Sequence, residues 1–333
     1  MDLLTKIDIS QADFKIDYNS NLFFIGSCFA DNISRKWTDR KFHVLANPLG
    51  VMYNPLSIES FFRKILDCNK DSWDRWDYQG SLSDEELKEI IHSSREFIAK
   101  ADVVFITQGT AFVYFLKESG KAVSNCHKEP AELFERRLIS VDEAAEALMN
   151  IVTTLHQINS QVQIVFTVSP IRHLNDGAHG NNLSKATLQL AVDKVIQEFA
   201  GNIAAGNNGA ASCKPNIATG KSSAAVSYFP SYEIVMDELR DYRFYAEDMT
   251  HVGPIAEDYI FERMCETYCS SETIADMKRV EKFMKGATHR IEDASSPSTM
   301  DFARLQIERA ENLEHVIDGL DLSKEKGYFR KFI

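Results

Sequence analysis

Two nucleophilic side chains follow a short apolar run near the start of the chain. The run Leu22–Ile25 leads into Gly26, Ser27 and Cys28, and a helix-like stretch continues to Trp37. Glycine permits a tight strand-to-helix turn, and a helix N-terminus favours the ionised form of a thiol or hydroxyl placed there. Cys28 is the better nucleophile by intrinsic chemistry, and Ser27 is the neighbouring alternative. The segment therefore predicts a nucleophile, unless Cys28 simply packs as a small apolar residue.

A carboxylate and an imidazole stand close together much later in the sequence. Asp248 and His251 are three residues apart, just before Pro254 and an apolar helical run. At this spacing both fit in one turn, so the carboxylate can fix the imidazole tautomer while the other ring nitrogen faces a nucleophile. A capping Asp beside an exposed His is the alternative. The two patterns together predict a catalytic triad built on Cys28 or Ser27.

The elements that must position these residues are predicted from apolar runs without polar alternation, which are typical of buried parallel strands. These runs are Leu22–Ile25, Val103–Ile106, Ile164–Val168 and Ala225–Phe229. Helix starts between them are marked by capping residues: Ser83 with Glu86, Ser140 with Glu143, and Asn54 ahead of Pro55. Alternating strands and helices predict a three-layer α/β/α sandwich with a mostly parallel central sheet, whose reactive edge lies at the carboxyl ends of the strands.

Composition narrows the function classes. The 333 residues include 37 Lys and Arg against 49 Asp and Glu, a net charge of −12, which disfavours nucleic acid and anionic membrane surfaces as partners. The six cysteines include no CxxC pair and predict a reducing, cytoplasmic location. The acidic N-terminus does not resemble a signal peptide, and no apolar run is long enough to span a bilayer. We expect no metal and no cofactor, because Asn125–His127 offers too few ligands and no P-loop is present.

The chain is predicted to divide into a catalytic α/β domain at residues 1–270 and a helical extension at 271–333. Residues 201–223, rich in Gly, Ala, Asn and Ser, are interpreted as a tolerated surface insertion, with a lid over the site as the alternative. The extension has a helical apolar pattern that predicts packing outside the sheet and offers a contact for a second copy of the chain. Its residues are Phe302, Leu305, Ile307, Leu313, Val316 and Ile317.

Gly26–Ala30 reads Gly-Ser-Cys-Phe-Ala, the signature of the GSCFA family, whose members are similar to the SGNH (GDSL-like) hydrolases. The resemblance extends over roughly Ile9 to Ala256. It implies an SGNH/flavodoxin-like fold and a reaction class, but no substrate. The other segments that carry it are Asn47–Gly50, Tyr53–Pro55, Thr107–Ala111, Asn125–Lys128, Ser169–His173, Tyr228–Glu233 and Asp248–His251.

The resemblance assigns catalytic roles position by position. Cys28 stands where the SGNH hydrolases have their nucleophilic Ser, and Ser27 stands in place of an Asp. A one-residue shift makes Ser27 the nucleophile and Cys28 a buried filler. Asp248 and His251 match the final Asp-x-x-His block in full. The resemblance therefore implies attack by Cys28 or Ser27, with His251 as general base and Asp248 orienting its ring.

The oxyanion-binding positions match only in part. The resemblance implies that the backbone N–H groups of Cys28 and Gly50 hold the oxyanion and that Gly109 shapes the same side of the pocket. Ala111 replaces the Asn that supplies a further donor in that superfamily. Because losing one such donor costs about two to three orders of magnitude in rate, we expect Gln108 or Asn54 to replace it, or a gentler reaction than ester hydrolysis.

Arg172 and His173 follow the third predicted strand, so we expect them at the reactive edge of the sheet, where they bind substrate or support residues that do. The implied activity is ester hydrolysis, with a small molecule or an O-acylated carbohydrate as substrate. An acyltransferase at the same site is one alternative. A non-catalytic SGNH-like carbohydrate-binding protein is the other, and the missing Asn at Ala111 favours it.

Overall fold

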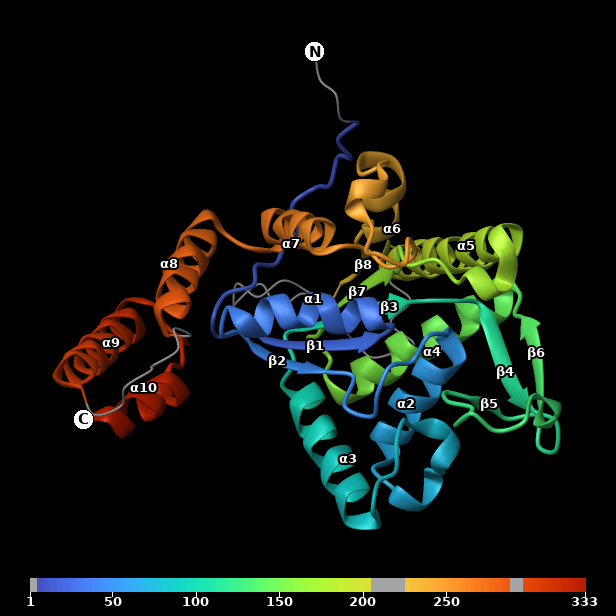
Figure 1. The fold of residues 1–333 in the computed structure, drawn as a ribbon. Coiled ribbons are helices and arrows are strands. Elements are labelled where there is room, and N and C mark those ends of the chain that lie inside the picture. Colours follow the sequence, from blue (N-terminus) through green and yellow to red (C-terminus); the bar gives the residue numbers. More distant parts are fainter. Residues whose placement is uncertain (1–4, 205–224, 288–295) are drawn as a thin grey trace. The chain divides into compact units, whose positions relative to one another are not determined.

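The computed structural model describes residues 5–204, 225–287 and 296–333 and has a five-stranded central sheet (Figure 1). The strands lie in the order β2-β1-β3-β7-β8, with β1 pairing in parallel with β3, β3 with β7, and β7 with β8. The four apolar runs predicted as strands are confirmed. The bounds are β1 Asn21–Gly26, β2 His43–Ala46, β3 Val103–Gln108, β7 Gln163–Val168 and β8 Val226–Tyr228.

The order of the strands determines where a site can form. The chain runs outward from β1 to β2 on one side and from β3 through β7 to β8 on the other. The direction in which the chain adds strands to the sheet therefore reverses between β1 and β3. In sheets of this order the ligand binds in the crevice beyond the carboxyl ends of those two strands. Cys28 begins the helix directly after β1. The topology thus puts the predicted nucleophile at the switch point of the sheet.

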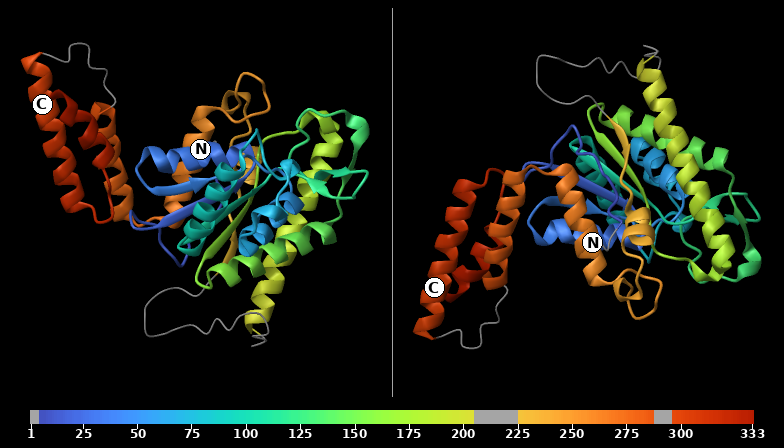
Figure 2. Two further views of the ribbon diagram at one scale, coloured as in Figure 1. Left: turned by 90° about the horizontal axis from the view of Figure 1, so that it is seen from below. Right: turned by 90° about the horizontal axis from the view of Figure 1, so that it is seen from above.

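Helices cover both faces of the sheet, so the three-layer prediction is confirmed (Figure 2). The apolar sides of α2 to α5 pack on one face with Val104, Ile106 and Phe166, while Phe24 and Phe105 stack on each other on the opposite face. All three predicted helix caps form. The helix bounds in this part of the chain are α1 Cys28–Asp39, α2 Pro55–Asp67, α3 Asp84–Ala99, α4 Val141–Ile158, α5 Gly177–Ala204, α6 Ser231–Glu233 with a π-helical turn at Ile234–Glu238, and α7 Pro254–Tyr268.

A small antiparallel sheet, absent from the sequence prediction, lies between β3 and α4 in the chain. Its strands are β4 Phe112–Leu116, β5 Ala122–Val123 and β6 Phe134–Leu138. Arg136 of β6 lies over the rings of Phe112 and Tyr114, so the sheet exposes an aromatic and cationic surface. Neither β4 nor β6 has a regular burial alternation, which is why no strand pattern stood out.

Contacts divide the chain into two units: Met1–Ile9, Asn21–Ser34 and Val44–Phe261 in one, and Ser10–Ser20, Arg35–His43 and Glu262–Ile333 in the other. The second unit contains α8 Ser271–Ala287, α9 Pro297–Val316 and α10 Ser323–Phe329, and α9 carries most of the apolar residues of the predicted extension. The division at residue 270 stays a prediction. Residues 205–223 of the predicted insertion lie outside the described residues, and α5 continues to Ala204. Within the described ranges, no helix combines the length and apolar character needed to cross a bilayer.

Replacing the cap of α2 tests how the sequence starts its helices. The Asn54 Oδ1 atom accepts the Ser57 N–H at 2.9 Å, and Asn54 is almost fully buried. Asn54→Ala should lower the free energy of unfolding by about 1 kcal/mol, measured by urea denaturation. Asn69→Ala, which removes an exposed cap from a single 3₁₀ turn, is the control and should cost less. Equal losses in both variants would contradict the expectation.

Candidate active site

Cys28 is the first residue of α1, and its Sγ atom lies 3.8 Å from the Nε2 atom of His251. The thiol is partly buried, and burial raises its pKa, with the Asp31 carboxylate acting in the same direction. The backbone N–H groups of Cys28 and Phe29 oppose this shift, because they donate toward the sulfur at the helix N-terminus. Since the net pKa shift is upward, the thiol needs a base to become a nucleophile near neutral pH, and the imidazole is in position to serve.

The second nitrogen of His251 contacts Asp248. The Nδ1 atom of His251 lies 2.5 Å from Asp248 Oδ2, and the other carboxylate oxygen accepts the backbone N–H groups of Thr250 and His251, each at 2.9 Å. These bonds, with the two backbone donors contributing most, hold the pKa of Asp248 far below its usual value. The carboxylate therefore stays ionised and can fix the imidazole with Nδ1 protonated and Nε2 facing the thiol.

Backbone contacts fix the loop that carries this pair. The Ala246 N–H donates to the His251 carbonyl at 2.8 Å, and Tyr245 and Val252 form an antiparallel bridge. After the loop, Glu257 of α7 accepts the Asn32 side chain of α1 at 2.7 Å. This contact joins the helix that begins at Cys28 to the helix that follows the His251 loop.

The turn before Cys28 is held by Asn47. The Gly26 N–H donates to Asn47 Oδ1 at 2.8 Å, and Asn47 Nδ2 donates to Asp31 Oδ1 at 2.6 Å. Gly26 has φ = +134°, and a Cβ atom there would lie 2.1 Å from the Thr107 carbonyl oxygen. The turn that presents Cys28 thus requires glycine for two reasons, its backbone conformation and the close approach of β3.

Ser27, the alternative nucleophile, lies differently. It is 1% exposed, and among the residues that the structure describes its Oγ atom has no hydrogen-bond partner. Of the two candidates, Cys28 is therefore the one that the fold brings to His251.

Two of the predicted oxyanion donors, Gly50 and Asn54, donate to other acceptors in the structure. The Gly50 N–H donates to the Asn47 carbonyl at 2.8 Å, so it does not face the sulfur as expected. The Asn54 amide donates to Ser57 Oγ within the helix cap. Gln108 is fully buried and, within the described ranges, its amide has no partner.

Gly109, predicted to shape the pocket, lies against Tyr53 and Ser27. Its N–H donates to the Tyr53 carbonyl at 2.8 Å, and a Cβ atom there would approach both Tyr53 and Ser27. At the sulfur, the backbone N–H of Cys28, which is one of the predicted oxyanion donors, and that of Phe29 both act to lower the pKa of the thiol.

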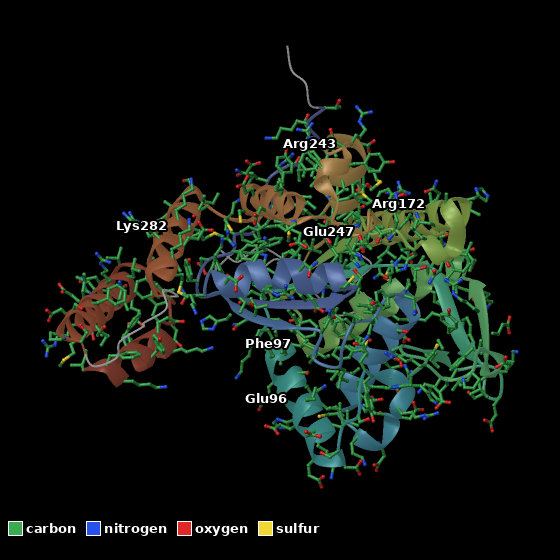
Figure 3. The ribbon with its side chains drawn as sticks, in the orientation of Figure 1. Glu96, Phe97, Arg172, Arg243, Glu247 and Lys282 are labelled. Atoms are coloured by element: carbon green, nitrogen blue, oxygen red, sulfur yellow. The ribbon has the colours of Figure 1, made fainter. Side chains whose placement is uncertain are left out.

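A cavity of about 360 Å³ adjoins the His251 loop, with Thr250 in its wall. His173 lines it and packs edge-on against the Tyr53 ring, with centroids 5.9 Å apart. Burial, with Lys185 adding to it, lowers the pKa of His173 to about 4, so this ring is neutral at pH 7. Arg172 also lines the cavity, and its guanidinium donates to Asn182 Oδ1 of α5 at 3.4 Å. Figure 3 shows Arg172 near α5. The remaining lining residues are mostly polar or aromatic: Asn54, Thr110, Phe112, Tyr114, Val123, Ser124, Cys126, Arg136, Leu174, Asn175 and Asp176.

Sequence reasoning missed three buried polar residues of α5 beside the site. Asn181 Oδ1 accepts the His173 N–H at 3.0 Å, Ser184 Oγ accepts the Ala111 N–H at 2.7 Å, and Lys185 is 1% exposed. A signal was present, because Lys185 stands three residues before Leu188 and therefore on the apolar side of the helix, where an isolated lysine is unusual. In the part of the chain that the structure describes, no three His, Cys, Asp or Glu side chains gather as metal ligands.

Comparisons with known proteins give one family match. The model of the GSCFA family matches residues 21–264. Among solved structures, an acetyl xylan esterase (Est2A) from the rumen bacterium Butyrivibrio proteoclasticus is similar over 75% of this chain and 64% of that chain, with 13% identity and a TM-score of 0.38. This chain therefore spans somewhat less than two thirds of the length of that structure. No curated protein matches the sequence.

Proposed function

The chain belongs to the GSCFA family, and we propose on that premise that it hydrolyses esters with Cys28 as nucleophile. The observation that carries the proposal is the chain of contacts from Cys28 Sγ through the His251 ring to Asp248. It has the order that nucleophilic acyl transfer needs: a nucleophile, a base in reach of it, and a carboxylate that orients the base.

The proposed reaction has two halves. His251 Nε2 takes the thiol proton as the sulfur attacks the ester carbon, and the resulting oxyanion accepts the N–H groups of Cys28 and Phe29. Collapse breaks the bond to the alcohol oxygen, which takes the proton from His251 and leaves a thioester on Cys28. Water then attacks the thioester with His251 again as base, and the sulfur departs and regains its proton as the acid is released.

For the substrate we propose an ester of a carbohydrate. The cavity beside His251 combines the aromatic rings of Tyr53, Phe112 and Tyr114 with hydrogen-bonding side chains such as Arg172. Rings and fixed polar groups together suit the apolar faces and the hydroxyl groups of a sugar.

Acylation of Cys28 tests the proposal directly. With 4-nitrophenyl acetate, the wild-type protein should release nitrophenol and carry an acetyl group on the Cys28 peptide by mass spectrometry. Cys28→Ala should lose both signals, because it removes the thiol that lies against His251. Cys68→Ser, which replaces an exposed thiol, is the control and should retain both.

Hydrolysis that continues at the wild-type rate in Cys28→Ala would overturn the proposal. Turnover that appears only with an added acceptor alcohol would instead indicate an acyltransferase that uses the same nucleophile.

A further inference from the structure

One charged side chain in the wall of the cavity beside His251 has only neutral partners. The Arg172 guanidinium donates to Asn182 Oδ1 at 3.4 Å and lies 3.0 Å from Met236 Sδ, and both of these atoms belong to uncharged side chains. Within the described ranges, no carboxylate forms an ion pair with Arg172. These contacts therefore hold the guanidinium in place but leave its charge uncancelled.

The other charged groups of the cavity wall cancel each other. Arg136 forms an ion pair with Asp176, whose side chain is fully buried. His173 is neutral at pH 7, because burial lowers its pKa to about 4. The wall therefore keeps one uncancelled positive charge, that of Arg172, in a chain whose net charge is −12.

Backbone contacts join the cavity wall to the proposed reacting groups. The Arg172 N–H donates to the Thr250 carbonyl at 3.4 Å, and Thr250 directly precedes His251. Tyr53 lines the same cavity, and its carbonyl accepts the N–H of Gly109, which lies against the turn that presents the nucleophile. A ligand in the cavity is therefore next to both the loop of the base and a residue that contacts the nucleophile turn.

We propose, resting on the ester hydrolysis proposed above, that the substrate carries a carboxylate and that Arg172 binds this carboxylate in the cavity. A guanidinium presents paired N–H donors that fit the two oxygens of a carboxylate, and hydrogen bonds between charged partners are stronger than neutral ones. The carboxylate belongs either to the sugar, as in an ester of a uronic acid, or to the acyl group, as in a succinyl ester. Both sources present the same chemistry to Arg172, and both narrow the substrate to acidic esters.

Ligand binding to Cys28→Ala tests this charge preference without turnover. Isothermal titration calorimetry compares methyl glucuronide with methyl glucoside, and monomethyl succinate with methyl butyrate. In each pair only the first compound carries a carboxylate. The anionic member of one pair should bind at least about tenfold more tightly than its neutral partner, because it gains charge-assisted hydrogen bonds. The pair that shows the difference identifies the source of the carboxylate.

Two substitutions at Arg172, made in the same background, assign the preference to this side chain. Arg172→Gln should remove the difference within the pair, whereas Arg172→Lys keeps the charge without the paired donors and should retain part of it. Arg243→Gln removes an exposed arginine that is not part of the cavity wall, and should leave the difference unchanged (Figure 3). Added salt should reduce the preference, because it screens the charge of the guanidinium.

Equal affinities within both pairs, no binding of any of the four compounds, or a preference that persists in folded Arg172→Gln would overturn the proposal. If Arg172→Gln fails to fold, a preference that is unchanged both by Arg172→Lys and by salt would overturn it instead. The two proposals can also fail separately. Anion-selective binding in a protein whose wild type hydrolyses no ester would refute the proposed function alone, and hydrolysis without any preference for anionic compounds would refute this inference alone.

Discussion

His251→Ala should reduce kcat/KM for ester hydrolysis by about 10²–10⁴-fold, the usual contribution of a positioned general base. The expected loss follows from the raised pKa of the Cys28 thiol. Burial and Asp31 raise the pKa of Cys28, so at neutral pH little thiolate exists without a base 3.8 Å away to accept the proton. The measurement is the rate of nitrophenol release from 4-nitrophenyl acetate between pH 6 and pH 10.

The pH profile of the variant distinguishes loss of a base from loss of structure. Without His251, activity depends on spontaneous ionisation of Cys28. It should therefore keep rising with pH beyond the usual range of a cysteine, because the pKa of this thiol is raised. His92→Ala on α3, which also removes an exposed imidazole next to a carboxylate, should behave as wild type. An unchanged rate in His251→Ala would remove the base from the mechanism.

The parts of the site that could be predicted from sequence are those coded by short, local patterns. Asp248 and His251 contact each other within one turn, and Cys28 follows an apolar strand, so spacing alone was informative. The parallel strands were predictable for the same reason, since buried runs such as Val103–Ile106 have no polar alternation.

The parts that escaped prediction depend on where distant segments meet. Whether the Gly50 N–H faces the sulfur depends on the Asn47 turn, whose carbonyl accepts it instead. Lys185 contacts the carbonyls after β3 and β7 only because α5 brings it to them. Sequence therefore predicted the side chains that the fold brings into contact, whereas the supports around them required the fold.

Gly26→Ala should be among the most destabilising substitutions in the chain, lowering the free energy of unfolding by about 3 kcal/mol or more. The added methyl group would meet the Thr107 carbonyl oxygen at 2.1 Å, and β1 and β3 are paired at this position, so neither strand can move without breaking the sheet. Urea unfolding monitored by circular dichroism gives the value.

Gly120→Ala separates the two causes of this loss. Gly120 also has positive φ, at +69°, but nothing lies within 4 Å of the place that an added methyl group would take, so this variant should lose only the backbone strain of about 1 kcal/mol. A similar loss in both variants would mean that the sheet yields at Gly26. In that case the turn that presents Cys28 would be adaptable. If Gly26→Ala loses much more stability than Gly120→Ala, the close approach of the Thr107 carbonyl to Gly26 also fixes the turn that places the sulfur opposite His251. Fold stability and catalysis would then depend on the same backbone contact.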